Sequence, residues 1–346
     1  MRALTISAHG GLDQIELRTD LPVPEPPPGW VRVRLRAAAL NHVDLFVVRG
    51  IPGIVITPPW IIGADGAGVL DAVGAGTTLP KRVREGDRVL LNPGFARADD
   101  EYVRRGDEPL SPTFGLLGEH YPGTYAEYVC LPAKCVRTIP TNVADDIAAA
   151  FTTVTLTAWR MVVKRARVTA GDDVLIWGIG GGVALAALLL CKSLGARVWV
   201  TSSSDEKLAK ARALGADETL NHTQVQVGSE IRALTGKRGV TVVLDSVGTA
   251  TWRQSLVALG RGGRLVTCGG TSGAVVETDV RRLFWNQWSL MGSTMGSEAE
   301  FEEVISELAA ERLTPVIDSR FPLERGREAL ERLQSGAQFG KIVLEI

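Results

Sequence analysis

Short segments of alternating apolar and polar residues run through the first part of the chain, up to about residue 140. Between positions 30 and 36, Val31, Val33 and Leu35 alternate with three arginines, which is the two-residue period of a half-buried strand. The glycine-bounded segments 63–76 and 85–89 predict short strands that meet at tight turns, as in a small barrel. The first part of the chain is therefore predicted to be rich in β-structure.

From about residue 145 the pattern changes to apolar, β-like runs that alternate with helical segments. A long helix is predicted over 147–165, and later helices end near residues 194, 214, 234 and 259. The predicted strands are 174–177, 197–201, 218–221, 240–245, 263–267 and 289–293, followed by a helix over 323–333 and a strand over 342–346. This alternation predicts an α/β fold, with a doubly wound parallel sheet covered on both faces.

The segment 174–191 carries no charged residue and reaches the minimum length of a membrane-spanning helix. Four glycines between positions 178 and 182 interrupt it, and each costs a helix about 1 kcal/mol relative to alanine. We therefore interpret the segment as a strand, a tight turn and a helix. The proline-rich segment 21–29 is interpreted as a connection, with a proline-rich recognition motif as the alternative.

The length of 346 residues predicts two domains, and a hydrophobic fraction of 45% with 22% charged residues is typical of a packed globular protein. The 38 basic and 39 acidic residues give a net charge of −1, which argues against nucleic acid or an anionic membrane as partner. The four cysteines contain no C-x-x-C pair, which argues against a disulfide scaffold. With no signal-peptide pattern at the N-terminus, a cytoplasmic location is expected.

The predicted strand 174–177 leads into the sequence G-I-G-G-G-V-A and then into a helix. Small residues at such a turn let backbone N–H groups approach a phosphate, which also faces the positive end of the helix dipole. Val183 stands where a strict G-x-G-x-x-G pattern needs its last glycine, but Gly178, Gly181 and Ala184 keep a spacing of small residues. We therefore expect a dinucleotide to bind here.

The next predicted strand ends in three serines, Ser202 to Ser204, and is followed by Lys207. A carboxylate at this place would bind the ribose 2′-hydroxyl of NAD, whereas hydroxyls and an ammonium suit the 2′-phosphate of NADPH. Ser203 and Glu206 also have the spacing of a helix capping box, which is the alternative role for that serine. Asp205 argues against NADPH, although it is predicted to lie inside the helix. We predict NADPH as the cofactor.

Several short motifs, in their order and spacing, together resemble the medium-chain dehydrogenase/reductase superfamily, and within it the zinc-free quinone oxidoreductase group. They are N-H-V-D at 41–44, G-A-D-G-A-G-V at 63–69, E-G-D-R-V at 85–89, G-T-Y-A-E-Y at 123–128, L-T-A-W at 156–159, the glycine turn, L-G-A-D at 214–217, V-L-D-S-V-G at 243–248 and G-K-I-V-L at 340–344. The resemblance covers essentially the whole chain. It implies a GroES-like catalytic domain over 1–148, completed by 294–346, and a Rossmann domain over 149–293.

Zinc-dependent members of this superfamily use a Cys, a His-Glu pair and a second Cys or Asp as metal ligands. The corresponding positions here are Asn41, Ala64 with Asp65, and Thr153, and the segment of the structural zinc lobe, near 93–118, holds no cysteine. Both zinc ions are therefore expected to be absent. An atypical metal site remains the alternative, with the candidate ligands His42, Asp44, Asp65, Glu119 and His120.

The resemblance implies hydride transfer from NADPH to a quinone or an α,β-unsaturated carbonyl. We predict Asn41 as the hydrogen-bond donor to the substrate oxygen, with His42 or Tyr121 as the proton source. The predicted cofactor-binding residues are Thr153, Gly178, Gly180, Gly181, Gly182, Val183, Ser202, Ser203, Lys207, His222, Val247, Gly269, Gly270 and Lys341. An alcohol dehydrogenase with an atypical metal site and a nucleotide-binding protein without turnover are the alternatives.

Phe284, Trp285 and Trp288 precede the last predicted strand of the Rossmann sheet. Members of the superfamily commonly pair their sheet edges at this place, so the resemblance implies a homodimer. An ordinary buried core is the alternative for these three aromatic residues.

Overall fold

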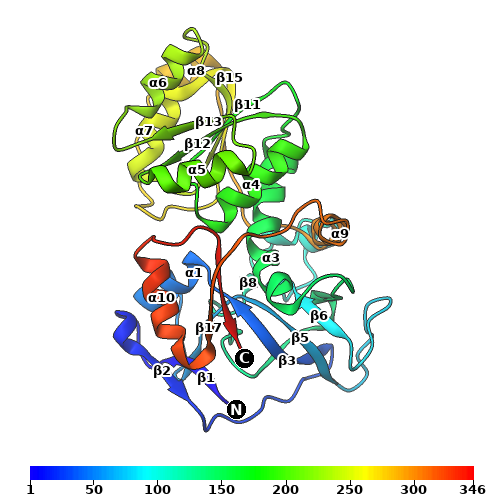
Figure 1. The fold of residues 1–346 in the computed structure, drawn as a ribbon. Coiled ribbons are helices and arrows are strands. Elements are labelled where there is room, and N and C mark those ends of the chain that lie inside the picture. The colour runs from blue at the N-terminus through cyan, green and yellow to red at the C-terminus, as the bar shows by residue number, and fades with distance from the viewer. The chain divides into compact units, whose positions relative to one another are not determined.

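The computed structural model describes residues 1–346, which form two compact units (Figure 1). Unit 1 comprises Met1–Val154 and Gly296–Ile346, and unit 2 comprises Thr155–Met295. The sequence prediction placed the two boundaries between 148 and 149 and between 293 and 294. None of the helices is long and apolar enough to cross a membrane.

Unit 1 is built mainly of strands, with the C-terminal strand of the chain completing its largest sheet. That sheet has the order β10-β6-β5-β3-β18-β17, and β9 also pairs with β3. The strands of unit 1 are β1 (Ala3–Ile6), β2 (Ile15–Arg18), β3 (Trp30–Ala39), β4 (Trp60–Ile61), β5 (Asp65–Val73), β6 (Arg88–Leu91), β7 (Gly94–Ala96), β8 (Phe114–Leu116), β9 (Tyr128–Pro132), β10 (Val136–Thr138), β17 (Ile317–Pro322) and β18 (Lys341–Glu345). The helices are α1 (His42–Arg49), α2 (Glu101–Arg104), α9 (Glu298–Ala309) and α10 (Gly326–Gln334), and α3 (Asp145–Trp159) begins in unit 1 and ends in unit 2.

The alternation read from the sequence of β3 is confirmed by the burial of its side chains. Val31, Val33 and Leu35 are at most 3% exposed and belong to one apolar cluster, together with Leu70 of β5. Arg32, on the opposite face, donates a 2.6 Å hydrogen bond to Asp71. β18 pairs antiparallel with β3 through Val343 and Ala39, which brings the start of β18 near the end of β3.

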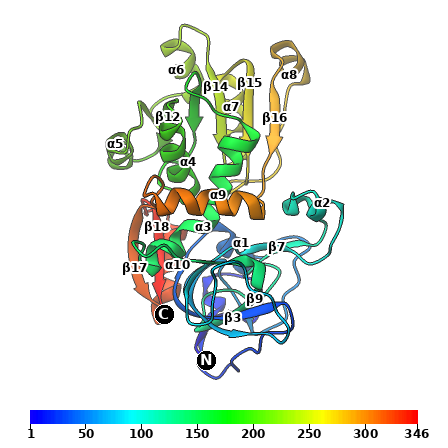
Figure 2. The same ribbon diagram turned by 90° about the vertical axis from the view of Figure 1, so that its right-hand side faces the viewer.

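Unit 2 contains a six-stranded parallel sheet of the order β13-β12-β11-β14-β15-β16 (Figure 2). The strands are β11 (Asp173–Ile176), β12 (Arg197–Ser202), β13 (Glu218–Asn221), β14 (Val240–Asp245), β15 (Leu259–Thr267) and β16 (Ser289–Gly292). The helices are α4 (Gly182–Ser193), α5 (Asp205–Ala213), α6 (Val227–Leu234), α7 (Thr249–Ala258) and α8 (Val280–Asn286). When these six strands are numbered by their order in the chain, their order across the sheet is 3-2-1-4-5-6, the arrangement of dinucleotide-binding Rossmann sheets. The predicted α/β fold class is confirmed.

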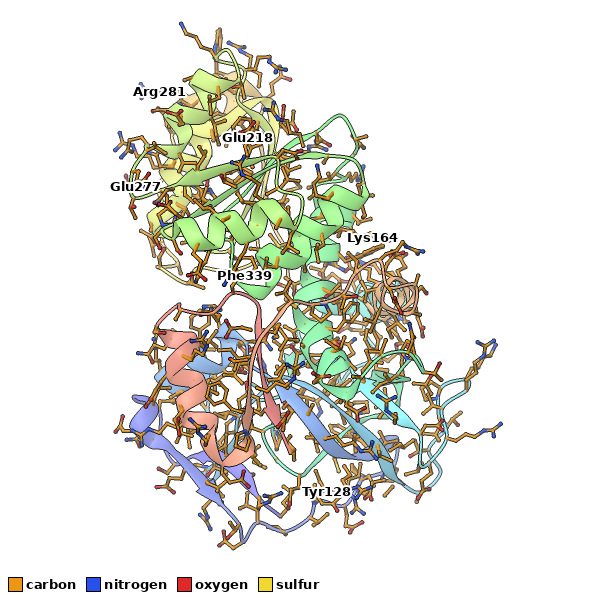
Figure 3. The ribbon with its side chains drawn as sticks, in the orientation of Figure 1. Tyr128, Lys164, Glu218, Glu277, Arg281 and Phe339 are labelled. Carbon is orange, nitrogen blue, oxygen red and sulfur yellow. The ribbon has the colours of Figure 1, made fainter.

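The strands of this sheet are buried on both faces, as expected for a parallel sheet between helix layers. Trp199 in the middle of β12 is fully buried, and Val227 and Ile231 of α6 pack in the same apolar cluster. Charged side chains such as Arg281 on α8 extend into solvent (Figure 3). The helix predicted over 147–165 is α3 followed by a π-helical segment, Arg160–Arg165, which the sequence pattern did not indicate.

Candidate functional site

The first group of candidate site residues surrounds the carboxylate of Asp65, the first residue of β5, which has no exposed surface. Its Oδ1 accepts a 2.9 Å bond from the backbone N–H of Thr153 and a 2.6 Å bond from the hydroxyl of the same residue. Its Oδ2 accepts a 2.9 Å bond from the side-chain amide of Asn41. A buried carboxylate is stable only when it is paired and hydrogen-bonded, and this one has a donor at both oxygens.

The positive charge next to Asp65 comes from Lys341, the first residue of β18, which is 3% exposed. Its ammonium donates to the carbonyl oxygen of Leu40 at 2.7 Å, to Oδ1 of Asn41 at 2.6 Å and to Oδ2 of Asp65 at 3.1 Å. Three acceptors match the three hydrogens of an ammonium group. Lys341 is therefore a fully partnered buried cation in the middle of this group.

Asn41 is the N-cap of α1 and forms a capping box with Asp44. Its side-chain nitrogen donates to Ala39 O at 3.3 Å as well as to Asp65, and its oxygen accepts from Lys341. This environment orients the amide, because the ammonium requires the oxygen on one side and the carboxylate requires the N–H group on the other. The hydrogen in the long bond to Ala39 O is the one that is held most weakly.

The carboxylate of Asp44, three residues after Asn41, is also buried. Its Oδ2 accepts a 2.7 Å hydrogen bond from the backbone N–H of Asn41 and another from the hydroxyl of Tyr125. Burial raises the pKa of Asp44 to about 7, although the hydrogen bonds from Tyr125 and Asn41 oppose this shift. Burial and the nearby Asp44 carboxylate hold the pKa of Tyr125 well above its usual value. Asp44 was named from the sequence only as a ligand of the alternative metal site, and Tyr125, which falls within one of the motifs of the resemblance, was not named as a site residue.

The two predicted proton sources lie in different surroundings. His42 is the first residue of α1 and is half-buried, and its pKa is lowered by burial and by the charges of Lys341 and Arg49. The ring of Tyr121 instead stacks on Phe95 at 4.5 Å. Tyr121 therefore packs against the apolar cluster around β3, apart from the Asn41 group.

The positions that correspond to zinc ligands form the hydrogen-bonded group just described. Asn41, Asp65 and Thr153 contact one another or the Lys341 ammonium, and Ala64 beside them is fully buried. No three His, Cys, Asp or Glu side chains of the chain are gathered as metal ligands would be, including the alternative candidates named from the sequence. Oε2 of Glu119 lies 3.8 Å from Nδ1 of His120, and that nitrogen accepts a 3.3 Å bond from the N–H of Leu116.

In unit 2 the glycine turn joins β11 to the N-terminus of α4. Gly178 and Gly180 have φ values of +70° and +121°, which side chains rarely adopt. Gly181 is the N-cap of α4 and provides no side-chain cap, while Gly182 and Val183 form the first turn of the helix. A Cβ atom added to Gly181 would meet only the carbonyl oxygen of Gly178, at 3.7 Å, so the space beside this turn is open. The turn therefore has the features of a pyrophosphate cradle.

The β12 end holds the residues predicted for the 2′-phosphate. Ser203 is exposed, Ser202 is only 4% exposed, and the N-cap of α5 is Ser204, whose hydroxyl accepts a 3.3 Å bond from the N–H of Lys207. The capping-box alternative for Ser203 is therefore wrong, because the helix begins one residue later than that alternative requires. The exposed hydroxyl of Ser203 remains available to a ligand, whereas the Ser202 hydroxyl accepts a bond from the N–H of Ser204.

The remaining predicted cofactor residues also follow parallel strands whose carboxyl ends share one edge of the sheet. His222 follows β13, lies 6.3 Å from the ring of Trp177, and has its pKa lowered by burial. Gly269 and Gly270 follow β15, and Val247 follows β14. The turn at Val247 is held by the buried Asp245, whose Oδ1 accepts the N–H groups of Val247 at 2.8 Å and Gly248 at 3.1 Å. Sequence reasoning missed Asp245, although it ends a predicted strand.

Comparison with known proteins matches residues 27–141 to the alcohol dehydrogenase GroES-like domain and residues 182–310 to the zinc-binding dehydrogenase family. A zinc-type alcohol dehydrogenase-like protein, YogA, of Leptosphaeria maculans is 33% identical over 339 residues, which cover 93% of this chain and 92% of that protein. The chain belongs to the medium-chain dehydrogenase/reductase superfamily. The predicted family is thus confirmed, and with it an oxidoreductase that uses a nicotinamide cofactor.

Two further members of the superfamily are similar to the chain over nearly its whole length. The quinone oxidoreductase of Homo sapiens is 28% identical over 351 residues, covering 99% of this chain and 97% of that protein. The crystal structure of an NAD-dependent alcohol dehydrogenase, 41% identical, superposes with a TM-score of 0.94 over 100% of both chains. The superfamily members similar to this chain therefore include a protein named as a quinone oxidoreductase and one named as an alcohol dehydrogenase.

Of the residues predicted from the sequence, the structure brings Asn41, Thr153 and Lys341 together in unit 1. It gathers the glycine turn, Ser203, His222, Val247 and Gly269 along one edge of the sheet in unit 2. It does not bring Tyr121 into the first group.

Proposed function

We propose that this chain is an NADPH-dependent, zinc-independent oxidoreductase that transfers hydride to quinones or α,β-unsaturated carbonyls. The observation that carries the zinc-independent part is the ammonium of Lys341, which lies against Asn41 and Asp65 at two of the positions that hold a metal in zinc-dependent relatives. Asn41 and Thr153 are poor zinc ligands compared with cysteine, and the buried cation already compensates the charge of Asp65. A divalent ion at this place would meet an existing positive charge.

The residues of unit 2 fit a dinucleotide at the glycine turn. The N–H groups at the start of α4 would bind the pyrophosphate beside Gly181, where the backbone leaves open space. Ser203 and Lys207 would bind the 2′-phosphate, and Val247, Gly269 and Gly270 would border the cofactor at the ends of β14 and β15. The bound cofactor supplies the hydride. Thr153 and Lys341, which were also predicted as cofactor contacts, both donate hydrogen bonds to the Asp65 carboxylate.

The substrate oxygen requires a hydrogen-bond donor, since no Lewis acid is part of this proposal. Asn41 would donate the amide hydrogen that is held only by the 3.3 Å bond to Ala39 O, and its partners Lys341 and Asp65 keep the N–H group in a fixed direction. In a quinone or an enone, the added negative charge spreads through the conjugated system, so one such donor suffices more readily than for a simple ketone. His42, beside Asn41, is the proposed proton source. Tyr121, the other residue named from the sequence, stacks on Phe95 and is not proposed for this role.

The test is an assay of NADPH oxidation with a panel of quinones, enones and simple ketones. The proposal expects turnover with the conjugated substrates, faster with NADPH than with NADH. Tight NADPH binding without turnover on any of them would favour a nucleotide-binding protein instead.

A second candidate is an alcohol dehydrogenase, which the names of two similar proteins favour, one of them named as NAD-dependent. It requires a metal site that the side chains described above would have to form in an unusual way. Metal analysis of protein purified without added zinc separates the candidates, because one bound metal ion per chain would favour the alcohol dehydrogenase.

We also propose a homodimer formed through the β16 edge of the sheet. Phe284 and Trp285 on α8, next to this edge, are 63% and 68% exposed, whereas Trp288 is buried and donates a 2.7 Å bond to Gly260 O. Exposed aromatic side chains beside a free strand edge are typical of an interface. Sedimentation analysis of Trp285→Ser against the parent chain tests this, with a shift to monomer expected.

A further inference from the structure

The carboxylate of Asp205 presents a difficulty for the proposed use of NADPH. Asp205 is the first residue of α5 and lies two residues after the exposed Ser203, in the turn that follows the second strand of a Rossmann sheet. A free carboxylate in this region binds the ribose 2′-hydroxyl of NAD and repels the 2′-phosphate of NADPH. The direction of the Asp205 side chain therefore bears on the cofactor preference.

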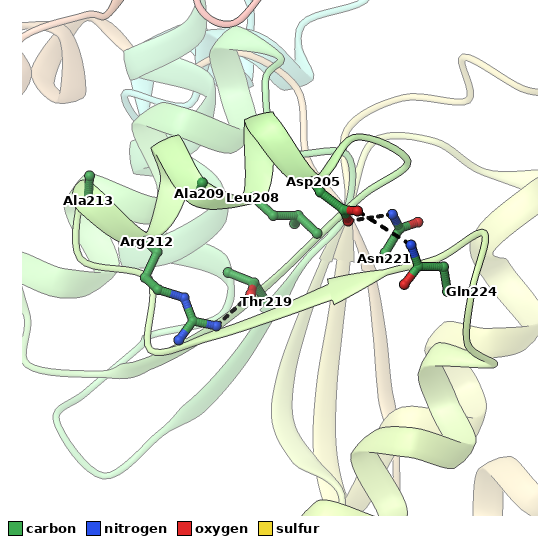
Figure 4. Close-up of a pocket in the computed structure, with 8 residues that line it drawn as sticks. All are labelled: Asp205, Leu208, Ala209, Arg212, Ala213, Thr219, Asn221 and Gln224. Carbon is green, nitrogen blue, oxygen red and sulfur yellow. Dashed lines mark hydrogen bonds between the residues drawn. The ribbon is translucent and has the colours of Figure 1, made fainter.

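Asn221 holds this carboxylate from the neighbouring strand. Asn221 is the last residue of β13 and is 9% exposed, and its Nδ2 donates to Asp205 Oδ1 at 2.7 Å and to the carbonyl oxygen of Ser203 at 3.4 Å. Gln224 Nε2 donates to the other oxygen of Asp205 at 3.4 Å (Figure 4). Both oxygens of the carboxylate thus have a donor on the β13 side of the turn.

The amide of Asn221 is itself fixed. Its Oδ1 accepts a 3.0 Å bond from the N–H of Thr223 and a 2.7 Å bond from the hydroxyl of Thr223. With donors on its oxygen and acceptors on its nitrogen, the amide has one satisfactory orientation. Asn221 therefore joins the turn after β12 to the loop after β13 through a buried side chain.

The Asp205 side chain faces a groove that the predicted phosphate-binding side chains do not line. This groove, of about 560 Å³, lies between α5 and β13 (Figure 4). Its lining residues are Asp205, Leu208, Ala209, Arg212, Ala213, Thr219, Asn221 and Gln224. Ser202, Ser203, Lys207 and His222 are not among them. The carboxylate is thus held on one side of the turn, and the side chains proposed to bind the 2′-phosphate lie outside that groove.

We infer that Asn221 determines the cofactor preference by holding Asp205 away from the ribose of the cofactor. This inference rests on the proposed preference for NADPH. Asn221 is a positioning residue, since it acts on the cofactor through the direction of the Asp205 carboxylate. Releasing that carboxylate places a negative charge where the 2′-phosphate, with a charge near −2, would bind.

The test measures kcat/KM for NADPH and for NADH in Asn221→Leu, which keeps the branched shape of the side chain and has no donor. We expect the NADPH to NADH ratio to fall at least tenfold. Adding Asp205→Asn to this variant removes the released charge, and we expect it to restore most of the ratio. Thr219→Val is the matched control, because it removes a 2.7 Å bond to Arg212 in the same groove without touching Asp205. Its ratio should equal that of the parent chain.

The outcomes separate this inference from the function on which it rests. A parent chain without NADPH preference refutes the proposed cofactor. If the parent prefers NADPH and Asn221→Leu keeps the same ratio, the inference about Asn221 is wrong. It is also wrong if the ratio falls and Asp205→Asn does not restore it, because loop disruption would then be the cause. If Asn221→Leu does not fold, Asn221→Asp replaces it in the test. This variant keeps the acceptor for Thr223 and loses the donor to Asp205, and we expect its NADPH to NADH ratio to be lower than that of the parent chain.

Discussion

The ammonium of Lys341 lies 3.1 Å from the carboxylate of Asp65 in the interior of unit 1, although 276 positions separate the two residues in the chain. Asn41 bridges them, since it accepts a bond from the first and donates one to the second. In a buried place such a pair is costly to break from one side, because the remaining charge has no partner. The pair thus connects the start of β18 with the start of β5.

Substituting Lys341 by methionine should therefore destabilise the protein strongly. We expect Lys341→Met to lower the free energy of unfolding by about 3–5 kcal/mol, because Asp65 is left as an uncompensated buried charge. Urea unfolding followed by circular dichroism measures this. The double variant Asp65→Asn with Lys341→Met removes both charges and should regain most of the loss. Equal destabilisation of the single and the double variant would show that charge pairing is not the reason.

The buried Asp44 makes the stability of unit 1 depend on pH. Burial raises the pKa of its carboxyl from 3.8 to about 7 in the folded protein, so the folded state holds this proton more tightly than the unfolded state does. The corresponding stabilisation is present below about pH 4 and is lost as the pH rises through 7. Between these limits we expect a loss of about 4 kcal/mol from this group.

Asp44→Asn keeps an acceptor for Tyr125 and Asn41 but cannot ionise. The difference in free energy of unfolding between Asp44→Asn and the parent chain, measured in urea at several pH values, isolates this residue from other titrating groups. The variant should gain stability relative to the parent as the pH rises from 5 to 8. A difference that does not change with pH would contradict the raised pKa.

Two neighbouring glycines should respond differently to alanine. Gly178 has a φ of +70°, so Gly178→Ala is expected to cost about 1 kcal/mol of stability or more through backbone strain. Gly181 has a φ of −75°, and its added Cβ meets nothing closer than 3.7 Å, so Gly181→Ala should fold with unchanged stability.

The added methyl group of Gly181→Ala extends into the open space beside the turn. We therefore expect it to weaken NADPH binding by about tenfold, as measured by quenching of tryptophan fluorescence. Unchanged NADPH affinity in Gly181→Ala would mean that the pyrophosphate does not bind at this turn.

Ser203 is the exposed hydroxyl at the end of β12 and provides a direct test of the phosphate site. Ser203→Asp adds a carboxylate that suits a ribose hydroxyl and repels a phosphate. The ratio of kcat/KM for NADPH over NADH should fall at least tenfold. Ser202→Ala, at a hydroxyl that is 4% exposed, should change the ratio much less. Similar effects of both substitutions would argue against the assignment of Ser203.

The strands and helices of the Rossmann domain could be predicted from the sequence because local patterns of apolar residues and glycines indicate each of them. The strands β13 and β14 have the bounds that alternation and apolar runs indicated, and the glycine turn stands between β11 and α4 as expected. Helix α1 was not predicted, since its start is set by the Asn41 and Asp44 capping box next to a strand end.

The candidate site was only partly predictable. Its members were named one by one, but the sequence does not show that the Lys341 ammonium contacts Asn41 and Asp65. That contact depends on the pairing of β18 with β3, which joins the last strand of the chain to an early one. The hydrogen bond from Asn221 to Asp205 likewise depends on the pairing of β12 with β13. Long-range strand pairing of this kind is not visible in local periodicity.

The central claim is that this chain reduces conjugated carbonyls with NADPH and needs no metal. The most direct measurement is the steady-state rate of NADPH oxidation with a quinone or an enone by protein that has been treated with a strong chelator and then freed of it. The account predicts the same rate before and after this treatment, with no increase when zinc is added. Loss of the rate after chelation and its recovery with zinc would contradict the account.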